Sequence, residues 1–327
     1  MSTALGRSLE LFYIDGRPDG MLTAEMFNWT GHVLVAPRTQ LAAALKRPQS
    51  RFTGIYLLLG EQEGEPRAYI GEGEDIGARI TSHDAQKDWW TTALLVTTAA
   101  NQLNKAHVRY LEARLIARAR EINRTPLDNG TTPSLPGLSE ADRAKMEAFI
   151  DNLLVVLPAV RVDMFIQRTR PAAPAGPQPA THPPTAAPSV PAPLATTPPA
   201  TTPPIAEVPR FDLRSARLGL DATATLRDGT FWVEAGSTAR ARWEGQNGEA
   251  GTYLPLYNEL VRAGVLAAQG EVRVFAQDYA FSSPSAAAAV VYGRSANGLT
   301  SWRLMGEGIT YKEWEARQLS QATEDEA

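Results

Sequence analysis

The chain has 327 residues, of which 43% are hydrophobic, 21% are charged and 8% are aromatic. This composition suits a folded protein of about two domains and excludes collagen-like, coiled-coil and wholly disordered chains. Lys and Arg number 32 against 36 Asp and Glu, a formal net charge of -4, so any nucleic-acid binding would depend on a local basic surface. The absence of cysteine excludes disulfides, thiolate metal sites and cysteine nucleophiles.

The sequence contains neither a secretory signal nor an apolar run of about 18 residues. We therefore expect a cytoplasmic protein with no membrane partner. No feature of the sequence indicates an obligate protein partner, and the oligomeric state is left undetermined.

A stretch rich in Pro, Ala and Thr divides the chain. Residues 171–206 contain no Asp, Glu, Lys or Arg. Proline at this density favours an extended, disordered spacer that cannot bury a core. The predicted organisation is a segment of unknown role at 1–50, a candidate catalytic domain at 51–170, the linker at 171–206, a second domain at 207–320 and an acidic tail at 321–327.

The region before the linker alternates strands and helices. Hydrophobic runs bounded by turn residues predict strands at Leu9–Ile14, Gly54–Leu59, Ala68–Gly71 and Trp90–Thr98. Helical spacing predicts helices at Thr39–Leu45, after the N-cap residue Asp75, and at Asn104–Ile122. We expect an α/β (α+β) fold whose core is a small antiparallel three-stranded sheet flanked by helices.

The region after the linker also mixes strands and helices. Asp228-Gly229 is typical of a two-residue hairpin turn, and Ser283-Pro284 is typical of a helix start. Asn297-Gly298 is expected to turn the chain into a strand, and Tyr311–Leu319 has the pattern of an amphipathic helix. These signals predict a second small α+β domain.

Glu112 occupies an unusual position in the helix expected at Asn104–Ile122. At about 100 degrees per residue it falls inside an apolar stripe, and burying an unpaired carboxylate costs several kcal/mol. The side chain therefore needs a partner. That partner is either Arg109 or Arg114 at the edge of the stripe, or water reached by the extended side chain, or a cation.

Two further pairs of residues have both ordinary and functional interpretations. Arg79 and His83 lie four residues apart beside the apolar face of their helix, where such residues usually form a solvated edge. Tyr56 and Tyr69 lie on the two strands of the predicted hairpin, where aromatic residues usually belong to the core. Each signal alone is weak.

Taken together, these residues resemble the GIY-YIG nuclease family. Gly54-Ile55-Tyr56 and Tyr69-Ile70-Gly71 reproduce the two family tripeptides on paired strands. Arg79 and His83 follow at the family's positions, and Glu112 lies on a helix, as in the family. The resemblance covers roughly residues 53–130. Members also use an asparagine after the glutamate, for which Asn129 is our first choice and Asn123 the reserve.

The resemblance implies a role for each of these residues. Glu112 would be the single protein ligand of Mg²⁺ or Mn²⁺, and Tyr56 would be the general base that deprotonates water. Arg79 would bind the phosphate and lower the pKa of the phenol. Tyr69, His83 and Asn129 would complete the catalytic residues. We therefore expect a metal-dependent endonuclease that hydrolyses DNA phosphodiester bonds.

Local positive charge along the long helix indicates how DNA would be bound. Lys105, Arg109, Arg114 and Arg118 are the candidate phosphate contacts, although a solvated face paired to carboxylates elsewhere explains the same charges. Trp89-Trp90 has two interpretations: stacking on an unpaired base, or the start of a strand that enters the core.

The second domain resembles a domain of unknown function that is often fused behind GIY-YIG cores, and more distantly a module attached to restriction enzymes and adenine methylases. That resemblance implies recognition of DNA or of a modified base, with no ligand residues assigned. Two alternatives to a DNA endonuclease are a catalytically inactive module that binds nucleic acid and a nuclease that acts on RNA or damaged DNA.

Overall fold

The structure is a computed structural model that describes residues 6–62, 65–84, 87–131, 133–167, 208–244 and 253–324, without the side chains of 83, 84 and 322–324. The predicted linker and the end of the predicted acidic tail lie outside these residues. Met1–Ile166 and Pro209–Ala327 belong to one compact unit. Below, the first part is residues 6–167 and the second part is residues 208–324.

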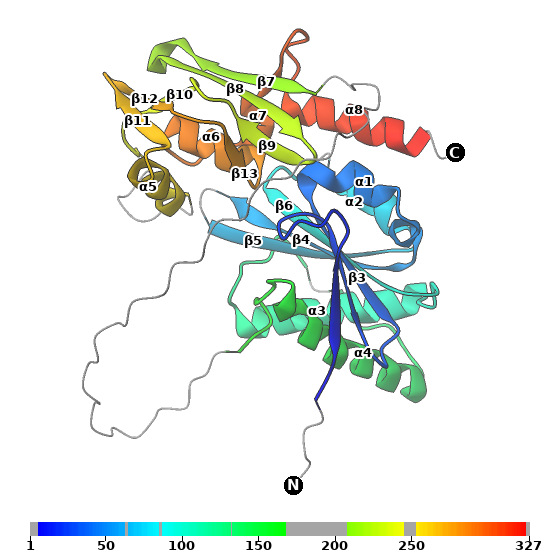
Figure 1. Ribbon diagram of the computed structural model, residues 1–327. Helices are drawn as coiled ribbons and strands as arrows, with labels where there is room; N and C mark the ends of the chain where they lie inside the picture. Colours follow the sequence, from blue (N-terminus) through cyan, green and yellow to red (C-terminus); the bar gives the residue numbers. More distant parts are fainter. Residues whose placement is uncertain are drawn as a thin grey trace, which may run out of the picture. The chain divides into compact units, whose positions relative to one another are not determined.

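A six-stranded antiparallel sheet forms the centre of the first part, in the order β1-β2-β3-β6-β4-β5 (Figure 1). The strands are β1 (Leu9–Tyr13), β2 (Leu22–Met26), β3 (Gly31–Pro37), β4 (Gly54–Gln62), β5 (Glu65–Gly73) and β6 (Trp90–Thr98). The expected three-stranded sheet is therefore too small. Six of the seven residues of β3 are buried, so β3 needs neighbours on both sides, and β2 and β6 supply them.

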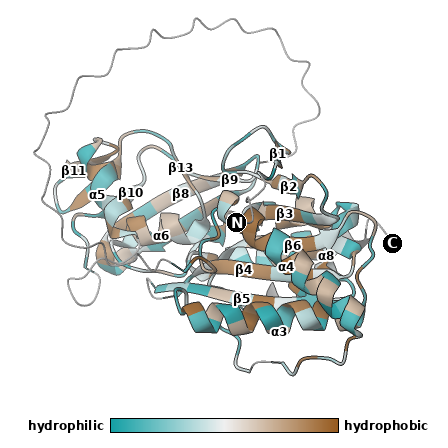
Figure 2. Cartoon of the chain, turned by 90° about the horizontal axis from the view of Figure 1, so that it is seen from below, coloured by the Kyte–Doolittle hydropathy of each residue, from teal (hydrophilic) through white to brown (hydrophobic). Residues whose placement is uncertain are grey.

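Helices cover both faces of this sheet (Figure 1). One face carries two short 3-10 helices (Arg38–Gln40 and Pro48–Arg51), α1 (Leu41–Leu45) and α2 (Ile76–Asp84); the other carries α3 (Lys105–Ile122) and α4 (Glu140–Ala159). The Asp75 and Asn104 side chains accept hydrogen bonds from backbone amides of α2 and α3, each at 2.9 Å, so both helix starts are fixed locally. β4 is predominantly hydrophobic because both of its faces are covered (Figure 2).

The second part contains two further antiparallel sheets, with orders β13-β9-β8-β7-β14 and β10-β12-β11. Its strands are β7 (Arg210–Ser215), β8 (Leu220–Arg227), β9 (Thr230–Val233), β10 (Thr238–Arg240), β11 (Leu266–Gln269), β12 (Val272–Phe275), β13 (Tyr279–Phe281) and β14 (Arg303–Leu304). Its helices are a 3-10 turn (Ala216–Leu218), α5 (Leu254–Arg262), α6 (Pro284–Tyr292), α7 (Gly298–Ser301) and α8 (Tyr311–Glu324). The mixed α+β character is as predicted, but Asn297 caps the short helix α7 and the strand begins only at Arg303.

Buried contacts join the two parts. Glu315 on α8 accepts a hydrogen bond from Nε of Arg38 at 3.0 Å and forms an ion pair with Nη2 at 2.9 Å, and both side chains are almost completely buried. Leu319, also on α8, belongs to the hydrophobic cluster of α1 and α2. The hairpin turn of the second part contributes as well, since the carbonyl of Gly229 accepts a hydrogen bond from Thr39. The two parts therefore share a core.

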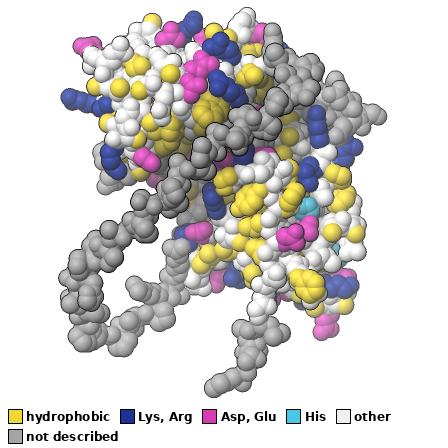
Figure 3. Space-filling model, in the orientation of Figure 1, with side chains coloured by type: hydrophobic (Ala, Val, Ile, Leu, Met, Phe, Trp, Pro, Cys, Tyr) yellow, Lys and Arg dark blue, Asp and Glu magenta, His cyan; other side chains and the backbone are white. Residues whose placement is uncertain are grey.

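The opposite edge of the first part carries exposed aromatic residues. Phe12 on β1 is 57% exposed and Phe27, just after β2, is 81% exposed. Hydrophobic side chains also gather on the face of the first part that Figure 3 shows. Tyr56, Tyr69, Arg79 and Glu112 lie on β4, β5, α2 and α3, away from these two strands. Within the described ranges, no helix has the length and apolar character needed to cross a bilayer.

Candidate active site

The two family-like tripeptides face one another in the β4–β5 hairpin. Tyr56 pairs directly with Gly71, and Tyr69 pairs with Leu58. The tyrosine rings are therefore diagonal neighbours, with centroids 6.0 Å apart. Tyr56 is fully buried, whereas Tyr69 is half-buried. This register brings both phenols to the face of the sheet that α2 covers.

Gly71 makes room for the Tyr56 ring. A Cβ at residue 71 would lie 2.5 Å from both Cζ and the hydroxyl of Tyr56. We predict that Gly71→Ala displaces this ring and lowers the free energy of unfolding by about 1–3 kcal/mol. Gly137→Ala is the matched control, because a Cβ there would have no neighbour within 4 Å. Urea denaturation of both variants checks this expectation, and equal midpoints would contradict it.

Burial dominates the ionisation of both tyrosines. It raises the pKa of Tyr56 far above the ordinary value for tyrosine, and it also raises the pKa of Tyr69. After burial, the interaction with Tyr69 is the next largest influence that raises the pKa of Tyr56. Arg79 lowers both pKa values, as expected, but its effect on Tyr56 is smaller than that of burial. The net pKa shift of Tyr56 is therefore upward, although Arg79 acts in the predicted direction.

The carboxylate of Glu112 lies in surroundings that disfavour its charged form. It is half-buried on α3 among the fully buried side chains of its helix face. Burial, followed by the negative charge of Glu72, raises its pKa to about 7, while Arg79, Arg109 and Lys105 act in the opposite direction. α3 packs on the face opposite to α2, yet the charge of Glu112 also raises the pKa of both tyrosines. β5 is the end strand of the sheet and carries only glycine at 71 and 73, so little separates the groups on its two faces.

Arg79 lies exposed on α2, at the mouth of a shallow cavity of about 400 Å³. Glu72 and Lys105 line the same cavity, and the Lys105 ammonium is 2.9 Å from Glu72. The positive charge of Arg79 acts on Tyr56, Tyr69 and Glu112. Tyr56, Tyr69, Arg79 and Glu112 are thus close enough to influence one another's charge, and we call this group their electrostatic neighbourhood.

The other two predicted catalytic residues are Asn129 and His83. The side-chain amide of Asn129 accepts a hydrogen bond from the backbone N–H of Ile70 at 3.0 Å and donates one to its carbonyl at 2.7 Å. Asn129 therefore fixes the edge of β5 beside Tyr69, and both ends of its amide are engaged. His83 belongs to α2, but its side chain lies outside the described residues.

The basic face of α3 is partly occupied by internal ion pairs. Arg114 forms two hydrogen bonds with Glu147 of α4, at 2.7 and 3.0 Å, and Lys105 pairs with Glu72. Arg109 and Arg118 are exposed and form no ion pair with any described residue. The available positive surface on α3 is accordingly smaller than the sequence suggests.

Two residues near the site were missed by the sequence analysis. Glu72 follows Gly71 directly, and the alternation of β5 places it on the α3 face with Ile70, which is the signal that would have identified it. Lys87 lies with its ammonium 4.7 Å from the centre of the Tyr69 ring and forms an ion pair with Asp128. No sequence pattern connects Lys87 with Tyr69, because the approach depends on the path of the chain after α2.

The carboxylates of the site are compatible with a hard divalent cation. Among the described side chains, no group of three or more His, Asp or Glu residues could hold a metal ion. Mg²⁺, however, keeps several waters and needs few protein carboxylates. Glu112, with a raised pKa and Glu72 nearby, offers oxygen ligands whose negative charge a cation would relieve. The donor set fits one hard ion at Glu112.

Sheet, helices and site together define a mixed α+β protein with acidic, basic and phenolic groups gathered at the end of one hairpin. Residues 211–315, from β7 into α8, match DUF4357, a domain of unknown function. A DUF4357 domain therefore makes up most of the second part. Searches of curated proteins and of solved structures found no match. The resemblance of residues 53–130 to GIY-YIG nucleases stays a prediction.

Proposed function

We propose that this protein is a divalent-metal-dependent endonuclease that hydrolyses DNA phosphodiester bonds with a GIY-YIG-type site. The observation that carries this proposal is the electrostatic neighbourhood shared by Tyr56, Tyr69, Arg79 and Glu112. A general base, a phosphate-binding cation and a metal ligand are the groups that phosphodiester hydrolysis needs. The DUF4357 domain would contribute to the choice of substrate.

In this proposal each side chain acts on a defined atom. The exposed guanidinium of Arg79 binds the non-bridging phosphate oxygens through its planar set of donors. Tyr56, whose ring lies beside that of Tyr69, would act in its ionised form as the general base that accepts the proton of the attacking water. Glu112 would hold the divalent ion, which would supply positive charge that neutralises the phosphate and favours ionisation of the nearby phenol. That additional charge is needed because Arg79 alone does not offset the burial of Tyr56.

Nicking of supercoiled plasmid by the purified full-length protein tests the proposal. We expect nicking with Mg²⁺ or Mn²⁺ and none with EDTA. Linear, methylated and single-stranded DNA and a matched RNA, assayed in parallel, establish the substrate class. Binding without cleavage of every substrate would favour the inactive nucleic-acid-binding alternative. Cleavage confined to RNA or to damaged DNA would favour the other alternative.

Tyr56→Phe tests the phenol directly. We expect turnover to fall by on the order of 10²–10⁴-fold, because the phenylalanine ring keeps the packing but cannot accept a proton. DNA affinity, measured by fluorescence anisotropy in EDTA, should be unchanged. Tyr110→Phe is the matched control, since Tyr110 is a buried tyrosine that binds Glu147 away from the site. Wild-type turnover of Tyr56→Phe would remove the phenol from the mechanism.

A further inference from the structure

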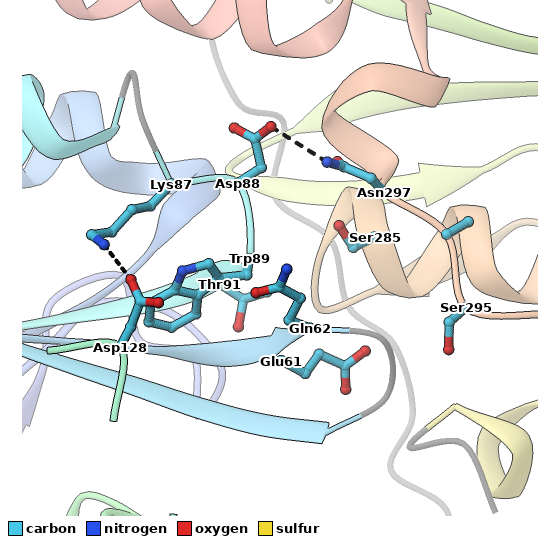
Figure 4. A pocket seen from close by; sticks show the side chains of 11 residues that line it. Glu61, Gln62, Lys87, Asp88, Trp89, Thr91, Asp128, Ser285, Ser295 and Asn297 are labelled. Carbon is cyan, nitrogen blue, oxygen red and sulfur yellow. Dashed lines mark hydrogen bonds and ion pairs between the residues drawn. The ribbon is translucent and has the colours of Figure 1, made fainter. Parts of the chain in front are cut away.

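A second cavity, of about 520 Å³, lies between the two parts (Figure 4). The first part contributes the half-buried Trp89 and the amide of Gln62, and the second part contributes Asn297, Ser285 and Ser295. This volume lies in the range of sites for small organic ligands. An aromatic ring, amides and hydroxyl groups are suited to a planar ligand with several hydrogen-bonding atoms.

The charges of the cavity disfavour a phosphate group inside it. Glu61, Asp88 and Asp128 line the cavity, and Lys87 is the one cation among its described lining residues. Asp88 already interacts with Asn297 and Lys312 of the second part, and Asp128 with Lys87. Because Lys87 is already engaged by Asp128, no cation among the described lining residues is available to an anion, and a neutral ligand is favoured over an anionic one.

Trp89 is held in place by the backbone around it. Its carbonyl accepts a hydrogen bond from the Glu61 amide at 3.1 Å. A Cβ at Gly60 would lie 2.1 Å from that carbonyl oxygen, so the close approach of the two strands depends on glycine. Of the two neighbouring tryptophans, Trp90 is fully buried in the core and Trp89 is left to line the cavity. The half-buried Trp89 side chain also packs against the hydrophobic core, and such an indole is a platform on which a planar ring can stack.

One end of the cavity adjoins the candidate active site. Lys87 and Asp128 lie at this end in Figure 4, with Ser295 at the other. The Lys87 ammonium lies over the ring of Tyr69, and the charge of Asp128 raises the pKa of Tyr69. A phosphate bound by Arg79 and Tyr69 would thus be separated from the cavity by little more than the Lys87–Asp128 pair.

We propose that this cavity binds an unpaired nucleobase, stacked on Trp89, of the strand whose phosphate lies at Arg79 and Tyr69. This inference rests on the proposed function and specifies its substrate class. A paired base cannot enter such a cavity, so the preferred nucleic acid carries a bulged, extruded or single-stranded base. The second part completes the cavity and thereby takes part in substrate choice.

Binding of two short DNA duplexes to the full-length protein tests the inference. One duplex is fully paired and the other carries a single bulged 2-aminopurine, and both are titrated in EDTA so that no cleavage occurs. The wild type should bind the bulged duplex on the order of tenfold more tightly, with a change in 2-aminopurine fluorescence. Trp89→Leu should reduce this preference to about twofold or less. Trp232→Leu, a half-buried tryptophan outside the cavity, should retain it.

A second cavity variant keeps the test valid if Trp89→Leu does not fold. Ser295→Phe fills the cavity from a loop of the second part and should abolish the preference while leaving Trp89 untouched. Equal binding of the two duplexes by the wild type, or a preserved preference in both cavity variants, would overturn the inference. Preference without any cleavage in Mg²⁺ would support the cavity and contradict the nuclease. Cleavage in Mg²⁺ without a preference for the bulged duplex would support the nuclease and contradict the cavity.

Discussion

Glu112→Gln is expected to abolish nicking of plasmid DNA in Mg²⁺ and, at the same time, to make the protein more stable at pH 8. The pKa of Glu112 is about 7 in the folded protein against an ordinary value of 4.5, so between these values the folded state binds more protons than the unfolded state. Stability therefore falls as the pH rises through this window. Glutamine does not ionise, so the variant avoids this decrease in stability. Its free energy of unfolding should exceed that of the wild type by on the order of 2 kcal/mol above pH 7, and the difference should disappear below about pH 4.5.

Thermal unfolding with and without Mg²⁺ separates the two effects. Mg²⁺ should raise the Tm of the wild type, since ligand binding to the folded state stabilises it, and should leave that of Glu112→Gln unchanged. Glu121→Gln, an exposed position on the same helix, is the matched control and should behave as the wild type. Nicking by Glu112→Gln, or an equal rise of its Tm with Mg²⁺, would exclude Glu112 as the metal ligand.

Glu315→Ala is expected to lower the free energy of unfolding by about 3–5 kcal/mol, because it leaves the buried guanidinium of Arg38 without its carboxylate. Arg38 also donates to the carbonyl of Lys87 at 3.0 Å and stacks 4.3 Å from the centre of the Trp90 ring. Loss of Glu315 should therefore disturb the segment that carries Lys87 and Trp89. Chemical denaturation measures the first effect, and the preference for bulged DNA reports the second.

Two further variants test whether the loss of stability comes from the buried ion pair of Arg38 and Glu315. Glu307→Ala breaks an exposed pair with Arg317 and should change stability by less than about 1 kcal/mol. The double variant Arg38→Met and Glu315→Leu replaces both charges with apolar groups and should recover most of the lost stability. If Glu315→Ala were as stable as Glu307→Ala, the buried pair would not join the two parts. Deletion of the second part is a poorer test, because it would also expose the cluster that Leu319 completes.

Local signals in the sequence predicted the hairpin and its helices well. Gly54 to Tyr56 and Tyr69 to Gly71 fall on β4 and β5, and the α3 cap at Asn104 is as expected. The extent of the sheet was missed, because the pairing of β3 with β6 joins residues far apart in the chain. The net pKa shift of Tyr56 was also missed, since burial is a property of everything packed around a side chain.

The sequence by itself determined the local framework of the candidate site: strand alternation sets which residues of the hairpin share a face, and helical periodicity puts Glu112 into an apolar stripe. Only the tertiary structure decided which charges surround that framework. The pairing of Arg38 with Glu315, the approach of Lys87 to Tyr69 and the cavity at Trp89 all join segments that no period or motif relates. Such contacts follow from the packing of whole elements, which depends on the shape of the complete core rather than on neighbouring residues.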